Sequence, residues 1–396
     1  MRIGIVLVLL AFLGGCVHEG SSITDPPIGI GAEESSLTVT ESGLVLSWLE
    51  PHKGDILLKM ALHNGLRWSE ARTIAKGDDW FVNWADFPAI VANGDMLFVH
   101  FLKKSAAPTF SYDVMYTVSP DMGESWSTPK KLHQDTVNAE HGFVSAVPYE
   151  DGFMVSWLDG RYTGEDNGAM TIRGAFVDPN GESHNATEID HSTCDCCQTS
   201  MTIVNGVPWT FYRDRTKEEI RDIYFSKMLD DGWTEPVAIH DDNWLINACP
   251  VNGPMATSYE ENMAVVWFTA ADGDQKTKLK ISQDEGKTFS DVILVDSPKS
   301  LGRVDIKMDS SRIYVTFLSR KDSDAAVKLK AYNYQGELVH SEIMSIVSTE
   351  RGTGFPRTAI WQNTLFISWT DVESNSIKIL QYPLDRNHIS ARGGWH

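Results

Sequence analysis

The sequence is poor in cysteine and basic residues, and it lacks convincing amphipathic helices. Among 396 residues there are five cysteines, and 34 lysines and arginines face 54 aspartates and glutamates, so the formal net charge is −20. A chain this acidic lacks the positive surface that neutralises phosphates, so we expect no nucleic-acid partner. The lack of a helical period argues against α-helical and α/β folds.

The one long apolar run lies at the N-terminus. Arg2 precedes the uncharged run 3–13, which ends at Leu13-Gly14-Gly15-Cys16. A run this short, ending in small residues, is typical of a secretory signal rather than of a membrane-spanning helix. The ending resembles the bacterial lipobox, which implies cleavage before Cys16 and lipidation of its thiol. The alternative is an ordinary signal peptide that a cysteine follows by chance.

These features divide the chain into four parts. We expect a lipoprotein signal peptide over 1–15, a lipid-anchored tether over 16–34, the folded body over 35–385 and a C-terminal tail over 386–396. The lipid would tie the protein to a membrane of the cell envelope. Because Val17 is not the aspartate that retains such lipoproteins in the inner membrane, the outer membrane is favoured if the host is Gram-negative.

One short pattern recurs seven times along the body. Each copy is a strand-like run of β-branched and aromatic residues ending in a bulky ring or leucine, at positions 48, 101, 157, 212, 268, 318 and 369. Strand-like runs precede and follow each copy, which predicts an all-β chain. Repeats of about 50 residues with about four strands each are typical of β-propeller blades. We therefore predict a β-propeller of seven four-stranded blades, with six blades as the alternative.

The last repeat reaches the end of the chain before its fourth strand. Residues 23–34 precede the first repeat and are available to supply that strand. Such pairing would close the ring and leave no bare sheet edge.

Two turns carry the same motif, S-x-D-x-G-x-x-W/F. Its residues are Ser119, Asp121, Gly123 and Trp126 in one turn, and Ser282, Asp284, Gly286 and Phe289 in the other. The motif resembles the Asp-box of sialidase-like propellers, in which it forms the turn between the third and fourth strands of a blade. We expect its aspartate to accept backbone N–H groups and its glycine to take a left-handed conformation. The box implies the fold and not sialidase activity, and sialidases have six blades.

The four cysteines of the body fall in two successive inter-blade connections. Cys194, Cys196 and Cys197 lie between the third and fourth repeats, and Cys249 lies between the fourth and fifth. Because neighbouring inter-blade loops lie side by side near the propeller axis, we expect the four sulfur atoms to converge.

Two kinds of chemistry fit such a cluster. Disulfides are natural in an exported protein. Clustered thiolates would instead make a redox-active site or a site for copper(I) or zinc, with His191 or His141 as a further ligand.

Several basic side chains fall in loops of the same face. An anionic glycan or small molecule is the ligand that arginines there would bind, since guanidinium groups grip carboxylates. The alternative for the segment 213–222 is that its arginines and aspartates pair among themselves. Trp80, Trp84 and Trp244, in inter-blade loops, would suit sugar stacking or blade packing. The ligand-contact candidates are Arg161, Arg213, Asp214, Arg303 and Arg357.

The mature chain resembles a group of exported bacterial sialidase-like proteins that carry the C-x-C-C motif, here Cys194-Asp195-Cys196-Cys197. That resemblance names no reaction. We expect a cell-envelope lipoprotein whose propeller presents a metal-binding or redox-active cysteine site. One alternative is an exo-α-sialidase, although no Tyr–Glu pair stands out in the loops that face the axis. The other is a non-catalytic module that binds glycan or protein.

Overall fold

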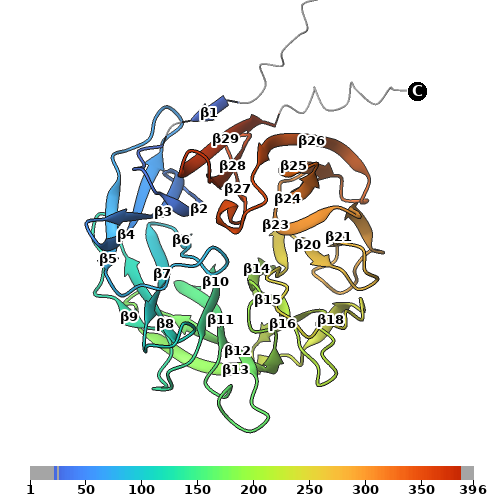
Figure 1. The fold of residues 1–396 in the computed structure, drawn as a ribbon, viewed down its shortest axis with the longest axis horizontal. Helices are drawn as coiled ribbons and strands as arrows, with labels where there is room; N and C mark the ends of the chain where they lie inside the picture. The colour runs from blue at the N-terminus through green and yellow to red at the C-terminus, as the bar shows by residue number, and fades with distance from the viewer. Residues whose placement is uncertain (1–21, 25, 385–396) are drawn as a thin grey trace, which may run out of the picture.

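The described part of the chain is a seven-bladed β-propeller. In the computed structural model, residues 22–24 and 26–384 form seven sheets arranged radially about one axis (Figure 1). The six-bladed alternative is therefore wrong, and the all-β prediction is confirmed. The one helical segment in these residues is the 3-10 turn η1 (Arg351–Thr353). The expected signal peptide 1–15, residues 16–21 and 25 of the expected tether, residue 385 and the tail 386–396 lie outside the described residues.

The first three blades each use four consecutive antiparallel strands, numbered outward from the axis. Blade 1 holds β2 (Glu33–Thr40), β3 (Gly43–His52), β4 (Asp55–His63) and β5 (Arg72–Gly77). Blade 2 holds β6 (Ile90–Asn93), β7 (Met96–Lys104), β8 (Tyr112–Ser119) and β9 (Lys130–Lys131). Blade 3 holds β10 (His141–Tyr149), β11 (Gly152–Asp159), β12 (Met170–Val177) and β13 (Ser183–Thr193).

The next three blades follow the same plan. Blade 4 holds β14 (Ser200–Val204), β15 (Val207–Arg213) and β16 (Ile223–Leu229), with β17 (Gly232–Trp233) and β18 (Val237–His240) both paired to β16. Blade 5 holds β19 (Met255–Tyr259), β20 (Asn262–Thr269), β21 (Lys276–Ser282) and β22 (Ile293–Asp296). Blade 6 holds β23 (Ser300–Met308), β24 (Ile313–Lys321), β25 (Asp324–Tyr332) and β26 (Leu338–Val347).

The last blade joins the two ends of the described chain. Blade 7 holds β27 (Arg357–Trp361), β28 (Thr364–Asp371), β29 (Ser376–Pro383) and the N-terminal strand β1 (Ser22–Thr24). Strand β1 pairs antiparallel with β29, with Ile23 opposite Leu380. Backbone pairing thus ties residues of the expected tether to the last blade.

The core lies between neighbouring blades. The second strand of each blade is covered on both faces, and β3, β11 and β20 are buried over eight consecutive residues. The repeated run of the sequence is this strand, because a strand packed on both faces needs apolar residues almost without alternation. Its rings Trp48, Trp157 and Trp267 are fully buried.

Both Asp-boxes form turns between third and fourth strands. In the first, between β8 and β9, Asp121 Oδ1 accepts the Ser125 N–H at 2.8 Å, and Gly123 has φ +82°. The second lies between β21 and β22, where Asp284 Oδ1 accepts the Thr288 N–H at 2.9 Å. Polar groups and a left-handed glycine thus close each turn, so the boxes are structural.

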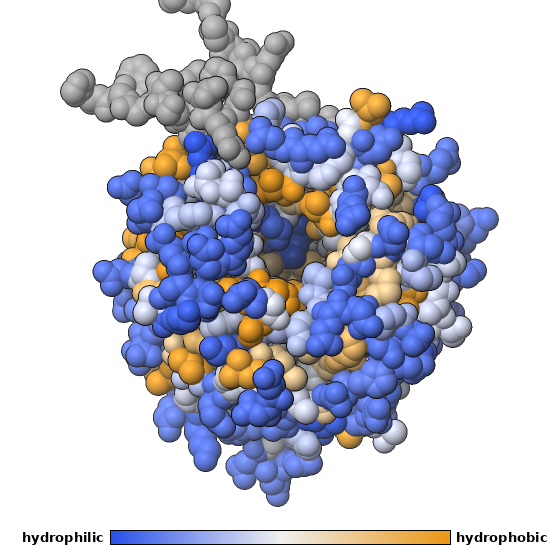
Figure 2. All heavy atoms as spheres, turned by 180° about the vertical axis from the view of Figure 1, so that it is seen from behind, coloured by the Kyte–Doolittle hydropathy of each residue, from blue (hydrophilic) through white to orange (hydrophobic). Residues whose placement is uncertain are grey.

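The inter-blade connections and the loops between second and third strands share one side of the ring, called the loop face below. Along the axis, the first strands of all seven blades line a cavity of about 190 Å³. A hollow is visible at the centre of the ring in the view from behind (Figure 2). Within the described residues, no helix has the length and apolar character needed to cross a bilayer.

Candidate functional site

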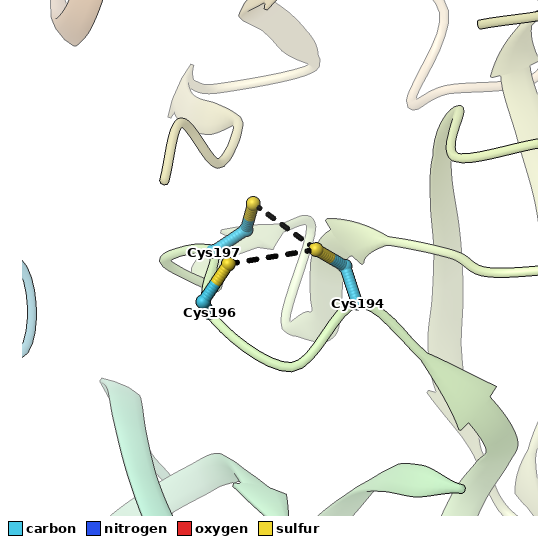
Figure 3. Close-up of side chains that lie close together, drawn as sticks. All are labelled: Cys194, Cys196 and Cys197. Carbon is cyan, nitrogen blue, oxygen red and sulfur yellow. Dashed lines mark hydrogen bonds between the residues drawn. The ribbon is translucent and has the colours of Figure 1, made fainter. Parts of the chain in front are cut away.

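The four body cysteines meet on the loop face. Cys196 is disulfide-bonded to Cys249, with Cα atoms 6.0 Å apart. The Sγ atom of Cys194 lies 3.4 Å from that of Cys197 and 4.0 Å from that of Cys196. The three sulfur atoms of the triplet point toward one another (Figure 3). The structure thus brings all four sulfur atoms together, with Cys194 and Cys197 as free thiols.

Close backbone contact holds the two cysteine loops against each other. The Gly253 N–H donates to Gln198 Oε1 at 3.0 Å. A Cβ atom at Gly253 would lie 1.9 Å from the Gln198 carbonyl oxygen, so no larger residue fits there without backbone movement. Arg213 adds a bridge by donating from Nη2 to the carbonyl oxygens of Asn252 at 2.8 Å and Phe268 at 2.7 Å.

The two free thiols have different electrostatic surroundings. A hydrogen bond from the Cys197 thiol, with the charges of Arg213 and Arg221, lowers the pKa of Cys194 to about 6 against the cost of burial. Arg221 Nη1 donates directly to Cys194 Sγ at 3.3 Å. Burial instead raises the pKa of Cys197 well above its usual value. At neutral pH the pair therefore consists of a Cys194 thiolate and a Cys197 thiol that donates to it.

Exposure separates the disulfide from the dithiol. Cys194 and Cys197 are 0% and 1% exposed, whereas Cys196 is half-buried and Cys249 is exposed. A partner in solution would therefore meet the disulfide first, with the thiolate behind it.

The structure does not place the expected histidine ligands with the sulfur atoms. The side chain of His191 is 87% exposed, and its Nδ1 lies 3.6 Å from Asp190. His141 is fully buried, but its ring faces Asp135 and Asp159. In the described part of the chain, the group of metal-type ligands that holds Cys194 contains no histidine. Position along a loop does not reveal which way a side chain points, and both histidines point elsewhere.

The arginines and the aspartate chosen from the sequence do not form one carboxylate-binding triad. Arg213 is 1% exposed and donates to backbone carbonyl oxygens. Arg161 grips Asp159, with its Nε and Nη2 each 2.7 Å from a carboxylate oxygen. Burial raises the pKa of Asp214 to about 7, and its backbone N–H donates to the Asp222 carbonyl at 2.9 Å. Arg213 and Asp214 thus hold the segment 213–222 through backbone groups and not through the expected Arg–Asp pairs, whereas Arg161 does pair with an aspartate.

Arg303 and Arg357 lie against aromatic rings around the axis. The Arg303 guanidinium is 4.7 Å from the centre of the Trp84 ring, and burial lowers the pKa of Arg303 to about 10. The Arg357 guanidinium is 5.6 Å from the centre of the Phe87 ring. The side chains of Phe87 and Arg357 both line the axial cavity. Trp84 itself is half-buried and stacks on Phe355.

The other two candidate tryptophans take part in packing. Trp244 is 6% exposed and lies under the Arg213 guanidinium, so of the two alternatives for this ring the packing one holds. Trp80 stacks on Phe101 with ring centres 4.4 Å apart. Neither ring offers an open platform for a sugar.

A Tyr–Glu pair was missed by sequence reasoning. The hydroxyl of Tyr112 lies 2.7 Å from Glu140 Oε1 and 3.1 Å from Asp86 Oδ2. Burial raises the pKa of Glu140 to about 8 and that of Asp86 to about 7. Tyr112 is fully buried, so its oxygen is enclosed rather than presented to a ligand. The signal was hidden because Tyr112 lies at the start of a strand and not in a loop.

Comparison with known proteins places the fold. Residues 52–367 match the family described as a BNR repeat-like domain. An ulvan lyase of polysaccharide lyase family PL25, bound to -[GlcA(1-4)Rha3S]-, is 12% identical, covers 91% of this chain and 94% of its own, and has a TM-score of 0.54. An endosialidase of phage phi92 is 8% identical over 95% of this chain and 70% of its own, with a TM-score of 0.50.

Identities this low show a shared fold alone. No curated protein sequence matches the chain. Because the family match spans most of the sequence and most of the propeller, the chain belongs to the BNR repeat-like domain family.

Proposed function

We propose that this protein is an exported lipoprotein whose propeller carries a thiol–disulfide redox centre. The observation that carries the proposal is the buried sulfur of Cys194, which accepts from Arg221 Nη1 at 3.3 Å and lies 4.0 Å from the sulfur of the disulfide-bonded Cys196. Thiolates are the attacking species in thiol–disulfide exchange, and a pKa near ambient pH favours attack.

The exchange needs no outside oxidant in its internal steps. The Cys194 thiolate attacks Cys196 Sγ, the Cys196–Cys249 bond breaks, and Cys249 leaves as a thiolate that takes a proton from water. Cys197 then attacks Cys194 Sγ, 3.4 Å away, the Cys194–Cys196 bond breaks, and the proton of Cys197 passes to Cys196, which leaves as a thiol. The net result moves one disulfide from the surface pair to the buried pair. The exposed dithiol formed in this way can reduce a disulfide of a partner, which re-forms the Cys196–Cys249 bond while Cys194 and Cys197 stay bonded to each other. An external thiol then supplies the two electrons that reduce the Cys194–Cys197 bond and restore the starting state.

We also propose that the cysteine centre, in its reduced state, could instead bind copper(I) or zinc. The sulfur atoms of Cys194, Cys196 and Cys197 lie close enough together to share an ion. Thiolates suit copper(I) and zinc. A reduced centre that held such an ion would bind metal and would not carry out thiol–disulfide exchange. Because Cys196 is disulfide-bonded here, all three ligands become available after reduction of that bond.

A coupled assay tests the redox proposal. The mature protein, given a thiol reductant, should accelerate reduction of a peptide disulfide, and Cys194→Ser should abolish that acceleration while leaving the far-UV circular dichroism unchanged. Zinc and copper content before and after reduction reports the metal alternative. A wild-type rate equal to that of the Cys194→Ser protein would refute redox turnover, and metal bound by the reduced wild type would then favour the metal site.

A second candidate function is binding of an anionic glycan at the axial cavity. It is favoured by Arg357 and Lys307, which line the cavity together with Phe87. One solved structure of the same fold, the ulvan lyase, is bound to a glycan. Binding of sulfated or uronic-acid oligosaccharides, measured by calorimetry, should weaken at least tenfold in Arg357→Met. Equal affinity in both proteins would exclude this site.

Anchoring is the third element of the proposal, and it depends on the Leu13-Gly14-Gly15-Cys16 ending. Cys16→Ser should remove radiolabelled palmitate from the protein and release it from the membrane fraction. Labelling that persists in the variant would refute lipidation at this residue.

A further inference from the structure

A second cluster of ligand-type side chains lies where blades 2 and 3 meet. His133 and Asp135 are in the connection between β9 and β10, His141 begins β10, and Asp159 ends β11. The side chains of both histidines and of Asp159 are 0% exposed, and that of Asp135 is 12% exposed. The fold thus gathers imidazoles and carboxylates that are up to 26 residues apart into one buried group.

The orientation of His141 leaves one ring nitrogen without a partner. Its Nδ1 lies 3.2 Å from the Tyr112 carbonyl oxygen, which can only accept, so Nδ1 carries a proton and donates. Its Nε2 is buried and makes no hydrogen bond. In the neutral ring that nitrogen carries a bare lone pair.

The distances around this nitrogen suit a shared ion better than hydrogen bonds. Nε2 of His141 lies 3.4 Å from Asp135 Oδ1 and 3.6 Å from Asp159 Oδ1, beyond the usual 2.7–3.2 Å of a hydrogen bond. Two ligands about 2.1 Å from one tetrahedral ion lie roughly 3.4 Å apart. Without a cation or an added proton, the lone pair would face two carboxylates.

Neighbouring groups already orient these ligands. His133 Nδ1 lies 2.7 Å from Asp135 Oδ2, and Asp113 lies 3.3 Å from the other nitrogen of His133. Arg161 holds Asp159 from outside the cluster and lies 3.2 Å from Asp135 Oδ2. A supporting shell of this kind fixes ligand orientation in metal sites.

We propose that His141 Nε2, Asp135 Oδ1 and Asp159 Oδ1 form a binding site for a divalent transition-metal ion. The mixed nitrogen and oxygen ligands select zinc or manganese over calcium, which prefers oxygen alone. Asp113 lies outside this set because the Nδ1 of His141 that it faces already donates to Tyr112. His133 is assigned an orienting role because its Nδ1 lies 2.7 Å from Asp135 Oδ2. This site uses no cysteine and is independent of the redox proposal.

Zinc binding to the folded protein tests the assignment. The Cys194→Ser/Cys197→Ser protein removes both free thiols, and after dialysis against zinc it should retain about one equivalent by elemental analysis. His141→Gln in the same background should lose that equivalent. His184→Gln is the matched control, because His184 also contacts an aspartate, Asp178, at 2.9 Å but on the surface, and it should bind as the parent does.

A second variant guards against loss of folding. Asp135→Asn keeps the shape of a partly exposed side chain and should weaken zinc binding at least tenfold in calorimetry, with an unchanged circular dichroism spectrum. Zinc, unlike calcium, should also raise the melting temperature of the parent. A parent protein that retains no zinc would overturn the proposal, and the cluster would then be only an ion pair between a protonated His141 and Asp135 or Asp159. Unchanged zinc affinity in both folded variants would equally overturn the proposal.

Discussion

The thiolate of Cys194 should depend on Arg221, and Arg221→Met tests this directly. The guanidinium donates to the sulfur at 3.3 Å in a buried setting. A hydrogen bond to a charged group contributes about 1.5–3 kcal/mol, and one pKa unit corresponds to about 1.36 kcal/mol. Loss of this donor should therefore raise the pKa of Cys194 from about 6 to roughly 7–8.

The assay is the thiolate absorbance near 240 nm, followed from pH 4 to pH 10 in protein with two free thiols and the Cys196–Cys249 disulfide intact. Arg221→Lys keeps the charge and should restore part of the shift. Cys197→Ala removes the donor that lowers this pKa most, and it should raise the pKa at least as far. Arg173→Met is the control, because Arg173 pairs with Glu188 and should leave the titration unchanged. An Arg221→Met titration that coincides with the wild-type curve would refute the electrostatic account of this thiol.

Three further outcomes follow from the geometry. Asp121→Ala removes the acceptor that closes the first Asp-box and should cost about 1–2 kcal/mol in urea unfolding; no change would mean that the turn does not depend on its cap. Gly253→Ala forces a Cβ onto the Gln198 carbonyl and should cost at least about 2 kcal/mol and expose the free thiols to alkylation, whereas wild-type thiol protection would contradict the close packing. The pKa of Glu140 is raised by burial to about 8, so its contribution to stability is complete below its unfolded pKa of about 4.5 and is lost as pH rises through 8. Glu140→Gln should therefore gain stability relative to wild type between pH 5 and pH 8, measured by urea unfolding at both values, and a constant difference would be inconsistent with the raised pKa.

The fold was predictable because its signal is repeated. Each second strand is enclosed by neighbouring blades, so its apolar run and closing ring recur at near-constant spacing, as Trp48, Phe101 and Trp157 show. The Asp-boxes were predictable for a related reason, since a tight turn with a left-handed glycine demands the same residues wherever it occurs.

The site was predictable only where chain topology decides it. Cys249 and the triplet had to approach because successive inter-blade loops are neighbours, and the structure joins Cys249 to Cys196. Side-chain direction is a different matter. His191 points to solvent, and His141 turns toward Asp135 and Asp159, because packing within each blade, and not loop position, sets those orientations.

Partners that depend on fine packing also escaped sequence reasoning. Arg213 appeared to be a ligand-binding or ion-paired residue, yet it donates to backbone carbonyl oxygens that no sequence pattern marks. Tyr112 and Glu140 are 28 residues apart and gave no motif, although their side chains are hydrogen-bonded.

Disulfide mapping after partial reduction tests the redox account most directly. The mature protein, starting from the state with Cys194 and Cys197 free, would be equilibrated in graded glutathione buffers, quenched in acid, alkylated and mapped by mass spectrometry. The account predicts a population in which Cys194 is bonded to Cys197 while Cys196 and Cys249 are both alkylated. A Cys196–Cys249 bond that opens directly to four free thiols, with Cys194 never found in a disulfide, would contradict it.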